Sequence, residues 1–355
     1  MDRTVYIKTT ESCNLNCKHC FTRGNRPARK FLDVEKTIDW IRRYTKTIDP
    51  NDHVHFEFHG GEPFLAPLET LKAITKAIRE DGPKNQSIGT TTNLVYKLKQ
   101  DLLNFIVDDL DSIATSWDKG IRFENPGQEF LWFSNMQKIR ERGKEVTLNV
   151  SLSRAVLEMK TTDLLLLLKG TGCYKVLFDR ITVDGNAKEH LDMFPNNAEI
   201  NQWYLRLHEA SELLGARKWF YNAALEDVYA KFEQGNSSCG TFCRDCEERL
   251  LTINANGTIG GCPNTAWAEP YGKISMEIED LFKSSKRIDV IVKEKTRNEA
   301  CFTCPVFNYC GSDCHQLAWE GDVCASPKQL MMKMAGLEVE LSPMKSKRFI
   351  PIKSA

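Results

Sequence analysis

The sequence contains no long apolar run, no excess of either charge and no secretion signal. Its longest aliphatic run, the five leucines at 164–168, is far shorter than the roughly 20 residues that a membrane-spanning helix requires. Lysine and arginine together number 48, as do aspartate and glutamate, which removes the electrostatic case for a nucleic-acid or anionic-membrane partner. The first residues, MDRTVYIKTTESC, include no apolar segment of the signal-peptide kind. We therefore expect a cytoplasmic protein that binds neither nucleic acid nor membranes.

Cysteine is too sparse for a disulfide scaffold, yet it is not scattered. The chain has 13 cysteines in 355 residues, below the roughly 8–10% that marks small disulfide-rich proteins. Twelve of them fall in two groups, at 13–20 and 239–324, and Cys173 lies between the groups. In a reducing compartment, clustered cysteines hold metal more often than they form disulfides. We expect two metal-binding regions and a buried Cys173 that acts as a small hydrophobic residue.

Between the two groups, β-like runs alternate with helical patterns. Six runs are expected to be strands: 4–10, 53–59, 87–93, 112–118, 146–152 and 174–183. Helical patterns lie between them, including one that Asp33 caps and one that Pro67 opens. Strand–helix repeats of this length predict parallel strands with helical crossovers. The expected fold class is α/β, with residues 1–184 forming a partial (β/α)6 TIM-like barrel whose chemistry lies at the C-terminal ends of the strands.

After the expected barrel the pattern changes. Residues 185–234 carry a helical pattern and are expected to bridge to a cysteine-rich region at 235–326. Within that region, Asn256-Gly257 lies between alternating residues, which is a strong signal for a β-hairpin. Residues 327–355 contain one more helical pattern and a mildly basic tail. We therefore expect four consecutive regions, of which the first and the third contain the metal-binding cysteines.

The first cysteine group, CNLNCKHC, offers three closely spaced thiolates and no obvious fourth ligand. A structural zinc site uses four ligands, and the nearest further donor, His19, is wedged between Lys18 and Cys20. An iron–sulfur cube held by three cysteines instead leaves one iron free for an exogenous ligand. The pattern therefore favours a [4Fe-4S] cluster whose fourth ligand is a substrate or a cofactor.

Cys13, Cys17 and Cys20 match the Cys-x3-Cys-x2-Cys signature of radical S-adenosylmethionine enzymes, and the sequence resembles that family. The second expected strand runs into HGGEP, residues 59–63, which resembles the family's motif for the methionine ammonium. Glycines let a backbone approach a ligand closely, and a carboxylate can accept a hydrogen bond from an ammonium. The resemblance implies that S-adenosylmethionine chelates the open iron and is cleaved to a 5′-deoxyadenosyl radical. It also implies that the cofactor-binding residues include Gly60, Gly61, Glu62 and Pro63.

Two further strand ends, Thr92-Asn93 and Ser116-Trp117-Asp118, resemble family sites that line the cofactor's ribose and carboxylate. Asn93 is followed by Leu94, where many members of the family have glycine. The resemblance implies that Thr92, Asn93 and Ser116 bind the cofactor. Polar residues at strand ends also serve simply as turn caps, which is the alternative interpretation.

Four polar residues share one face of the second expected strand: His53, His55, Glu57 and His59. Positions two apart on a strand lie about 7 Å from each other, too far for a single metal ion without further ligands. We expect this row to line the interior of the barrel.

The second cysteine group resembles the SPASM extension of radical S-adenosylmethionine enzymes, in seven cysteines from Cys246 onward and in the hairpin glycine. The resemblance implies two auxiliary [4Fe-4S] clusters, and so three clusters in the chain. One would be held by Cys246, Cys262, Cys314 and an upstream cysteine, for which we favour Cys239 over Cys243. The other would be held by Cys301, Cys304, Cys310 and Cys324. A zinc knot of Cys301, Cys304, Cys310 and Cys314 is the alternative.

The resemblance also implies a function, because family members with this extension largely modify peptides and proteins. We expect an oxidoreductase that crosslinks a ribosomally made precursor peptide. Its expected partners are that peptide or a protein substrate, and an electron donor of the flavodoxin or ferredoxin type. The barrel pattern begins at residue 4, so binding of a leader peptide is expected to need a separate protein or the surface of residues 184–235.

Three other functions remain open. Two are enzymatic: a formylglycine-forming sulfatase maturase, and a radical dehydrogenase of a small alcohol or sugar. Oxidation of serine or cysteine calls for a base, and Asp118, Asp179 and Asp184 are candidates that the sequence does not rank. The third is a non-catalytic iron–sulfur or zinc-binding protein. The HGGEP turn argues against it, since such a protein needs no site for a cofactor ammonium.

Overall fold

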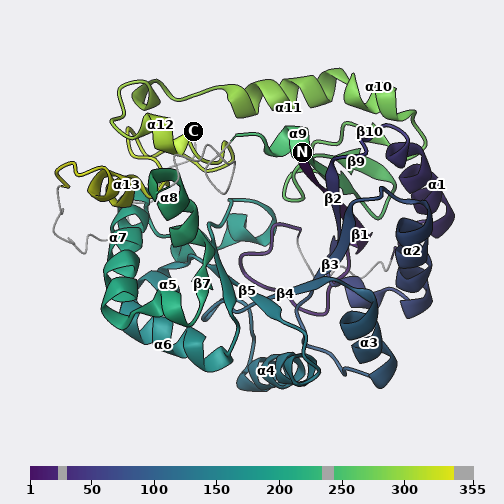
Figure 1. The fold of residues 1–355 in the computed structure, drawn as a ribbon, viewed down its shortest axis with the longest axis horizontal. Helices are drawn as coiled ribbons and strands as arrows, with labels where there is room; N and C mark the ends of the chain where they lie inside the picture. The colour runs from purple at the N-terminus through teal and green to yellow at the C-terminus, as the bar shows by residue number, and fades with distance from the viewer. Residues whose placement is uncertain (23–29, 234–243, 340–355) are drawn as a thin grey trace.

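The computed structural model describes residues 1–22, 30–233 and 244–339, and it is built on one curved ten-stranded sheet (Figure 1). The strands are β1 (Asp2–Thr10), β2 (His53–Gly60), β3 (Gln86–Thr91), β4 (Ser112–Ser116), β5 (Val146–Ser151), β6 (Lys175–Asp179), β7 (Tyr221–Asn222), β8 (Leu250–Ile253), β9 (Thr258–Gly260) and β10 (Gly272–Lys273). Their order in the sheet is β10-β9-β8-β1-β2-β3-β4-β5-β6-β7. The six expected barrel strands are confirmed, as neighbours in chain order.

Helices connect these strands and cover the outer side of the sheet (Figure 1). They are α1 (Val34–Thr45), α2 (Leu68–Asp81), α3 (Gln100–Asn104), α4 (Pro126–Glu141), α5 (Arg154–Leu157), α6 (Thr161–Thr171), α7 (Asn197–Leu214), α8 (Ala223–Glu233), α9 (Cys246–Arg249), α10 (Ile278–Phe282), α11 (Ser285–Lys295), α12 (Phe307–Cys310) and α13 (Lys328–Met334). Shorter helical turns are η1 (Pro63–Leu65), η2 (Phe105–Asp109), η3 (Gly185–Glu189), η4 (Leu191–Met193), η5 (Ala216–Lys218) and η6 (Glu299–Cys301). The first helix begins where the sequence predicts it, because the Asp33 carboxylate accepts a hydrogen bond from Lys36 N and so caps α1.

The sheet is a partial barrel, as expected, and it does not close. Strands β1 to β7 pair in parallel, each with the next, and the sheet ends at β7 on one side and at β10 on the other. Strand β5 shows how the two faces differ, because its residues alternate between buried and half-buried. Val146, Leu148 and Val150 pack under the helices, while the residues between them face the inside of the curve. The inner face is thereby left free for polar side chains.

Two apolar clusters hold the helices against the outer face. One gathers around Trp132 of α4 and Trp203 of α7, and the other around Trp40 of α1 and Ile74 of α2. Cys173 belongs to the first cluster, where it is 3% exposed and its Sγ lies 3.5 Å from the sulfur of Met136. The expectation of a buried Cys173 is confirmed. No helix in the described ranges is both long and apolar enough to cross a membrane.

The region after the barrel joins the same sheet. The expected hairpin is confirmed as β8 and β9, which pair antiparallel around a turn in which Gly257 has a φ of +80°. Strand β8 also pairs in parallel with β1, from Thr4 opposite Leu250 to Ile7 opposite Ile253. Strand β7, two residues long, extends the other edge from within the segment expected to be a helical bridge. The cysteine-rich region is thus continuous with the barrel sheet.

Candidate active site

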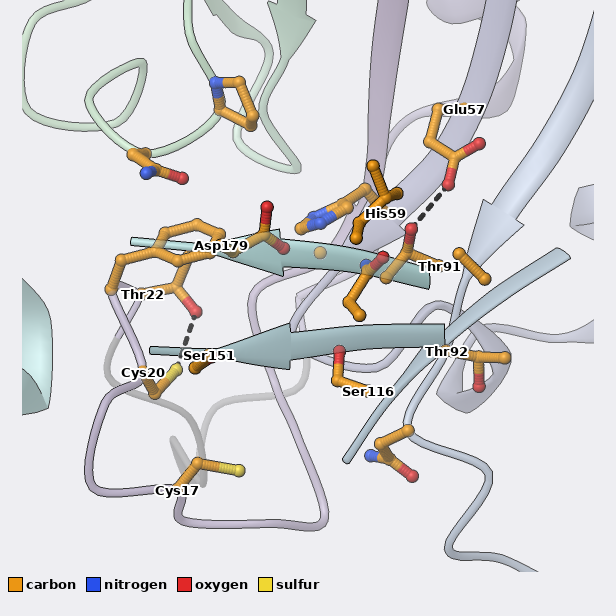
Figure 2. A pocket seen from close by; sticks show the side chains of 18 of the residues that line it. Cys17, Cys20, Thr22, Glu57, His59, Thr91, Thr92, Ser116, Ser151 and Asp179 are labelled. Atoms are coloured by element: carbon orange, nitrogen blue, oxygen red, sulfur yellow. Dashed lines mark hydrogen bonds between the residues drawn. The ribbon is translucent and has the colours of Figure 1, made fainter. Parts of the chain in front are cut away.

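The inside of the curved sheet forms a cavity of about 680 Å³, which is lined by the first cysteine triplet and by most of the predicted cofactor-binding residues (Figure 2). Its wall runs along strands β1 to β6 and includes residues near their starts as well as at their C-terminal ends. The loop after β1 contributes Cys13, Cys17 and Cys20, and the cysteine-rich region contributes Pro263 and Asn264. The location agrees with the expectation that the chemistry lies at the strand ends.

The first cysteine loop places three thiols on one wall of this cavity. Lys18 N donates to the carbonyl of Ile121 at 2.9 Å, and Cys20 N donates to that of Cys17 at 3.1 Å, so backbone hydrogen bonds fix the loop. Burial raises the pKa of the Cys13 thiol to about 12 and that of Cys17 to about 11. At neutral pH both thiols therefore keep their protons unless a metal displaces them. Soft sulfur donors converging on a cavity fit an iron–sulfur cluster.

Gly60 and Gly61 are required by the cysteine loop itself. Gly60 has a φ of +141°, and a Cβ at this position would lie 2.2 Å from the carbonyl oxygen of Thr10. A Cβ on Gly61 would lie 2.1 Å from the carbonyl oxygen of Ser12. Gly61 N also donates to Thr10 O at 2.8 Å. The two glycines let the end of β2 pack directly against the start of the cysteine loop, while they also line the cavity.

Glu62 organises the end of β3. Its carboxylate is fully buried and accepts hydrogen bonds from Thr92 Oγ1 at 2.7 Å, Asn93 N at 2.8 Å and Phe64 N at 3.2 Å. Burial raises its pKa to about 7. Pro63 is buried next to it as the first residue of η1. The predicted residues Glu62, Thr92 and Asn93 are therefore brought together, with Thr92 and Asn93 on the cavity wall.

The turn after Asn93 explains why many members of the family that this sequence resembles have glycine at the next position. Leu94 has a φ of +54°, a conformation that glycine adopts without the steric cost of a side chain. Here leucine occupies it and is completely buried. Asn135 on α4 donates to the carbonyls of Leu94 at 2.9 Å and Tyr96 at 2.7 Å, which supports the turn. Asn93 meanwhile donates to Asn14 Oδ1 at 2.8 Å and so reaches the cysteine loop.

The three candidate bases have different environments. Asp118 is buried against Arg122 and His19, and although burial opposes ionisation, these partners hold its pKa well below the usual range. Asp184 is half-buried and lies 3.5 Å from Lys188. Asp179 lines the cavity at the end of β6, where desolvation by the surrounding protein, with the charge of Asp118, raises its pKa to about 6. Of the three, Asp179 is placed to exchange a proton with a molecule in the cavity.

The polar row on β2 lines the interior as expected, except for His53 at the start of the strand. His55, Glu57 and His59 are on the cavity wall. His59 lies between the rings of Tyr6 and Phe21, and burial lowers its pKa to about 3, so it is neutral. Its Nδ1 is buried and has no hydrogen-bond partner among the residues that the structure describes. The same is true of Asn149 Oδ1 on the opposite wall, so the cavity offers free polar atoms to a polar ligand.

Sequence reasoning missed a second support of the cysteine loop, at the start of η3. Gly185 has a φ of +54°, and a Cβ there would lie 2.3 Å from the carbonyl oxygen of Cys20. Asn186 N donates to that oxygen at 2.8 Å. The Asn186 side chain donates to Asn16 Oδ1 at 2.9 Å and to the carbonyl of Cys17 at 3.1 Å. A lone Gly-Asn pair after a strand was the available signal, and it resembles any other turn.

The second cysteine group lines a separate cavity of about 260 Å³. The residues on its wall include the four cysteines expected to hold one auxiliary cluster: Cys301, Cys304, Cys310 and Cys324. Cys314 lies instead near Cys262, whose pKa is raised to about 12 by burial and, to a smaller extent, by the charges of Glu247 and Cys314. Cys239 and Cys243 lie outside the described residues, so the choice between them stays a prediction. In the ranges described, no three histidine, cysteine or acidic side chains are grouped as a single metal ion would need.

Buried charges hold the loops of this second region. Arg180, next to Asp179, forms an ion pair with Asp313 in which both side chains are about 5–6% exposed. The same Asp313 carboxylate accepts from Ser326 Oγ at 3.0 Å, and that hydroxyl lies 3.0 Å from the sulfur of Cys310. Glu294 accepts from Cys246 N at 2.8 Å. One network thus connects the wall of the large cavity to the cysteines of the small one.

Comparisons with known proteins agree with this site. Residues 7–153 match the family model described as the radical SAM superfamily. The radical SAM cyclopropyl synthase TigE of Paramaledivibacter caminithermalis is 18% identical over 333 residues, which cover 88% of this chain and 67% of that protein. The structure of native anSMEcpe with bound AdoMet and Cp18Cys peptide has a TM-score of 0.75 at 17% identity, over 94% of this chain and 95% of the other.

Streptococcus suis SuiB bound to the precursor peptide SuiA has a TM-score of 0.61 at 14% identity, over 89% of this chain and 72% of the other. Because both structural matches cover about nine-tenths of the chain, the shared fold includes the cysteine-rich region. The family match, by contrast, covers the barrel strands β1 to β5 and the first cysteine loop. Residues 7–153 are therefore a radical SAM domain, and the protein is an enzyme of the radical SAM superfamily.

Proposed function

We propose that this enzyme uses a 5′-deoxyadenosyl radical to modify a ribosomally made precursor peptide oxidatively, by crosslinking it. The observation that carries the proposal is the convergence of three elements on one cavity. The cysteine triplet, the glycines of the HGGEP turn and the Thr92-Asn93 strand end all line it. Structures of the same fold with bound peptides, anSMEcpe and SuiB, support a peptide as the substrate class.

Membership of the superfamily implies S-adenosylmethionine and a [4Fe-4S] cluster, and the residues fit both. Cys13, Cys17 and Cys20 would hold the cluster through three irons. The backbone of Gly60 and Gly61, with Thr92, Asn93 and Ser116, would hold the cofactor's amino acid and ribose. When bound, the pair supplies a carbon radical that removes a hydrogen atom from substrate. Glu62 acts behind this wall, because its carboxylate holds Thr92 and Asn93 in place.

Two auxiliary clusters are part of the proposal. The supporting observation is that four thiols share the 260 Å³ cavity, namely Cys301, Cys304, Cys310 and Cys324. The other set would be Cys246, Cys262, Cys314 and, upstream, Cys239 in preference to Cys243. The described cysteines are all free of disulfides, which suits the reducing cytoplasm in which we place the enzyme. An electron donor of the flavodoxin or ferredoxin type and a separate leader-binding protein complete the proposed partners.

Among the three predicted aspartates, Asp179 is the one that lines the cavity. A base at this place would serve the oxidation of a serine or cysteine side chain. A formylglycine-forming sulfatase maturase is therefore the second candidate function. The two are distinguished by their products, since a crosslinked peptide resists fragmentation between the joined residues and a formylglycine peptide does not.

The test is anaerobic co-expression of the enzyme with each short open reading frame that flanks its gene. Intact-mass and fragment spectra of the peptides are then compared with those from co-expression with the Cys17→Ala variant. We expect one peptide to be lighter by two hydrogens, with fragmentation suppressed across one segment, and to be unchanged with the variant. If every peptide is unchanged while the purified enzyme still cleaves S-adenosylmethionine, the precursor-peptide proposal is wrong, and sulfatase peptides and small alcohols become the substrates to test.

A further inference from the structure

A continuous chain of hydrogen-bonded side chains leads from the protein surface to the cavity. His53, at the start of β2, is 34% exposed in its side chain, and its Nε2 lies 3.0 Å from Ser87 Oγ on β3. The same hydroxyl lies 2.9 Å from His55 Nδ1, and His55 Nε2 lies 2.9 Å from Glu57 Oε2. The other oxygen of Glu57 accepts from Thr91 Oγ1 at 2.6 Å in the cavity (Figure 2). We name this set of His53, Ser87, His55 and Glu57 the β2–β3 chain.

Every bond of the β2–β3 chain can be satisfied in two arrangements of hydrogens. In the first, His53 Nε2–H donates to Ser87, Ser87 donates to His55 Nδ1, and His55 Nε2–H donates to ionised Glu57. In the second, all three bonds are reversed: protonated Glu57 donates to His55, His55 to Ser87, and Ser87 to His53. His53 then carries its hydrogen on Nδ1, which faces the exposed Asp2 at 3.6 Å. The second arrangement holds one proton more than the first.

The backbone around Glu57 leaves room for this pair of side chains. A Cβ on Gly89, the residue of β3 next to Glu57 in the sheet, would lie 2.5 Å from Glu57 Oε2 and 2.8 Å from His55 Cε1. Any residue larger than glycine at this position would therefore displace the Glu57–His55 hydrogen bond. Glu57 is 8% exposed, so its carboxylate depends on the bonds from His55 and Thr91. These contacts keep the end of the chain at the cavity wall.

We propose that the β2–β3 chain carries the proton that the substrate loses from the cavity to solvent, an inference that rests on the proposed function. Joining a C–H carbon to an X–H group breaks both bonds, forms C–X and removes two hydrogens. One hydrogen leaves as an atom and ends in 5′-deoxyadenosine. The other leaves as a proton to Glu57, and an oxidised iron–sulfur cluster, held by the cysteines proposed above, would supply the acceptor for its electron. Passage from the second hydrogen arrangement to the first then releases one proton at His53 and regenerates ionised Glu57.

Such a route matters once a peptide fills the cavity. A peptide that reaches the strand ends displaces water from the cavity, and a proton released there has no bulk solvent beside it. Glu57 is on the cavity wall in the middle of β2, while His53 is the first residue of that strand and is partly exposed. Ser87 is the single hydroxyl between the two histidines, so removing it interrupts the chain without removing a charge.

The decisive variants are therefore Ser87→Ala, which breaks the chain, and Ser87→Thr, which restores the hydroxyl. Ser112→Ala is the matched control, because Ser112 begins the next strand, β4, and no hydrogen bond between described residues joins it to the β2–β3 chain. We expect Ser87→Ala to lower product formed per 5′-deoxyadenosine about tenfold, which is less than the roughly 10²–10⁴-fold of direct acid–base catalysis because Ser87 acts through Glu57. It should also raise the solvent deuterium isotope effect on product formation, because proton exit becomes the slow step. Ser87→Thr should recover most of the loss, and Ser112→Ala should match the parent enzyme.

The measurement uses the reconstituted enzyme with the peptide modified in the co-expression experiment. If Ser87→Ala matches the parent enzyme in product ratio and isotope effect, or if Ser87→Thr fails to restore them, the proposal is wrong. If the parent enzyme modifies no peptide, the proposed function has failed, and the chain is tested separately. In that case ¹⁵N spectra of the histidine rings should show His53 and His55 changing tautomer together in the parent protein and independently in Ser87→Ala. Independent changes in both proteins would reject the chain.

Discussion

The two cysteine regions of this protein differ in what surrounds their thiols. Three cysteines of the N-terminal loop share a cavity of about 680 Å³ with many polar side chains, whereas four cysteines of the C-terminal region line a cavity of about 260 Å³. The first cavity is the larger and has three cysteines on its wall, whereas the second is smaller and has four. The contrast indicates one site that admits a further molecule and one that is complete with protein ligands.

The two regions also differ in what fixes them. The N-terminal loop is positioned by backbone contacts that glycines make possible, from Gly60 and Gly61 on one side and Gly185 on the other. The C-terminal loops are positioned by buried charges, among them Arg180, Asp313 and Glu294. An added side-chain atom destabilises close backbone packing, whereas the loss of one partner destabilises a buried ion pair. The two regions should therefore respond to different kinds of mutation.

The largest expected effect separates the roles of the two regions. Cys17→Ala should abolish 5′-deoxyadenosine formation, because it removes one of three ligands of the proposed radical-generating cluster. Cys304→Ala should leave some uncoupled cleavage of S-adenosylmethionine but no modified peptide. The measurement is chromatographic quantification of 5′-deoxyadenosine, with iron analysis of each variant. Equal loss of cleavage in both variants would contradict this division of roles.

A smaller effect, on the free energy of unfolding, is expected at the ion pair that connects the two regions. Arg180→Met leaves the Asp313 carboxylate buried without its partner, which costs about 3–5 kcal/mol of unfolding free energy. The double variant Arg180→Met/Asp313→Leu removes both charges and should recover most of that loss. Denaturant unfolding of the parent protein and both variants measures this. A double variant no more stable than the single one would show that Asp313 is held mainly by its other partner, Ser326.

Glu62 should make the N-terminal region sensitive to pH. Its pKa in the folded protein is about 7, above the ordinary value of 4.5, so the folded state keeps a proton that the unfolded state has released. Stability from this group is therefore complete below pH 4.5 and declines as the pH rises to 7, by about 3 kcal/mol. In cluster-free protein, Glu62→Gln should remove this decline, as unfolding at pH 4.5 and 8 would reveal. The same decline in both proteins would assign it to other groups.

The smallest of these effects tests the packing of the cysteine loop. Gly61→Ala places a Cβ 2.1 Å from the carbonyl oxygen of Ser12 and should cost about 1–3 kcal/mol of unfolding free energy. It should also lower iron bound at the first site, because the loop must move. Gly170→Ala on α6 is the control, since a Cβ there meets nothing within 4 Å and should stabilise the helix slightly. A Gly61→Ala variant with normal stability and iron content would mean that the loop can shift at no cost.

Much of the fold followed from sequence, because strand and helix periodicity is local. The alternation around Asn256-Gly257 predicted the β8–β9 hairpin, and six strands were found in their expected order. The pairing of β8 with β1 was not foreseen, since nothing in either strand specifies a partner so distant in the chain. Strand β7 was missed because two residues carry no periodicity.

The sequence predicted those site residues whose spacing along the chain is characteristic of a binding motif. The fixed intervals of the cysteine triplet and the HGGEP turn indicated residues that the cavity does bring together. Spacing could not rank Asp118, Asp179 and Asp184, because only the fold shows that Asp118 faces Arg122 while Asp179 faces the cavity. It also could not reveal Ser87, whose importance depends on two histidines of the neighbouring strand.

The parallel pairing of β1 with β8 has a consequence for biosynthesis. Strand β1 leaves the ribosome early, yet one of its edges stays unpaired until Leu250–Ile253 has been made. During that interval the nascent barrel exposes an open β-edge, the kind of surface on which chains aggregate. Contacts between segments so far apart also slow folding. Translation that ends before residue 250 would therefore release an incomplete, aggregation-prone barrel, so the cysteine-rich region also covers the otherwise open edge of β1.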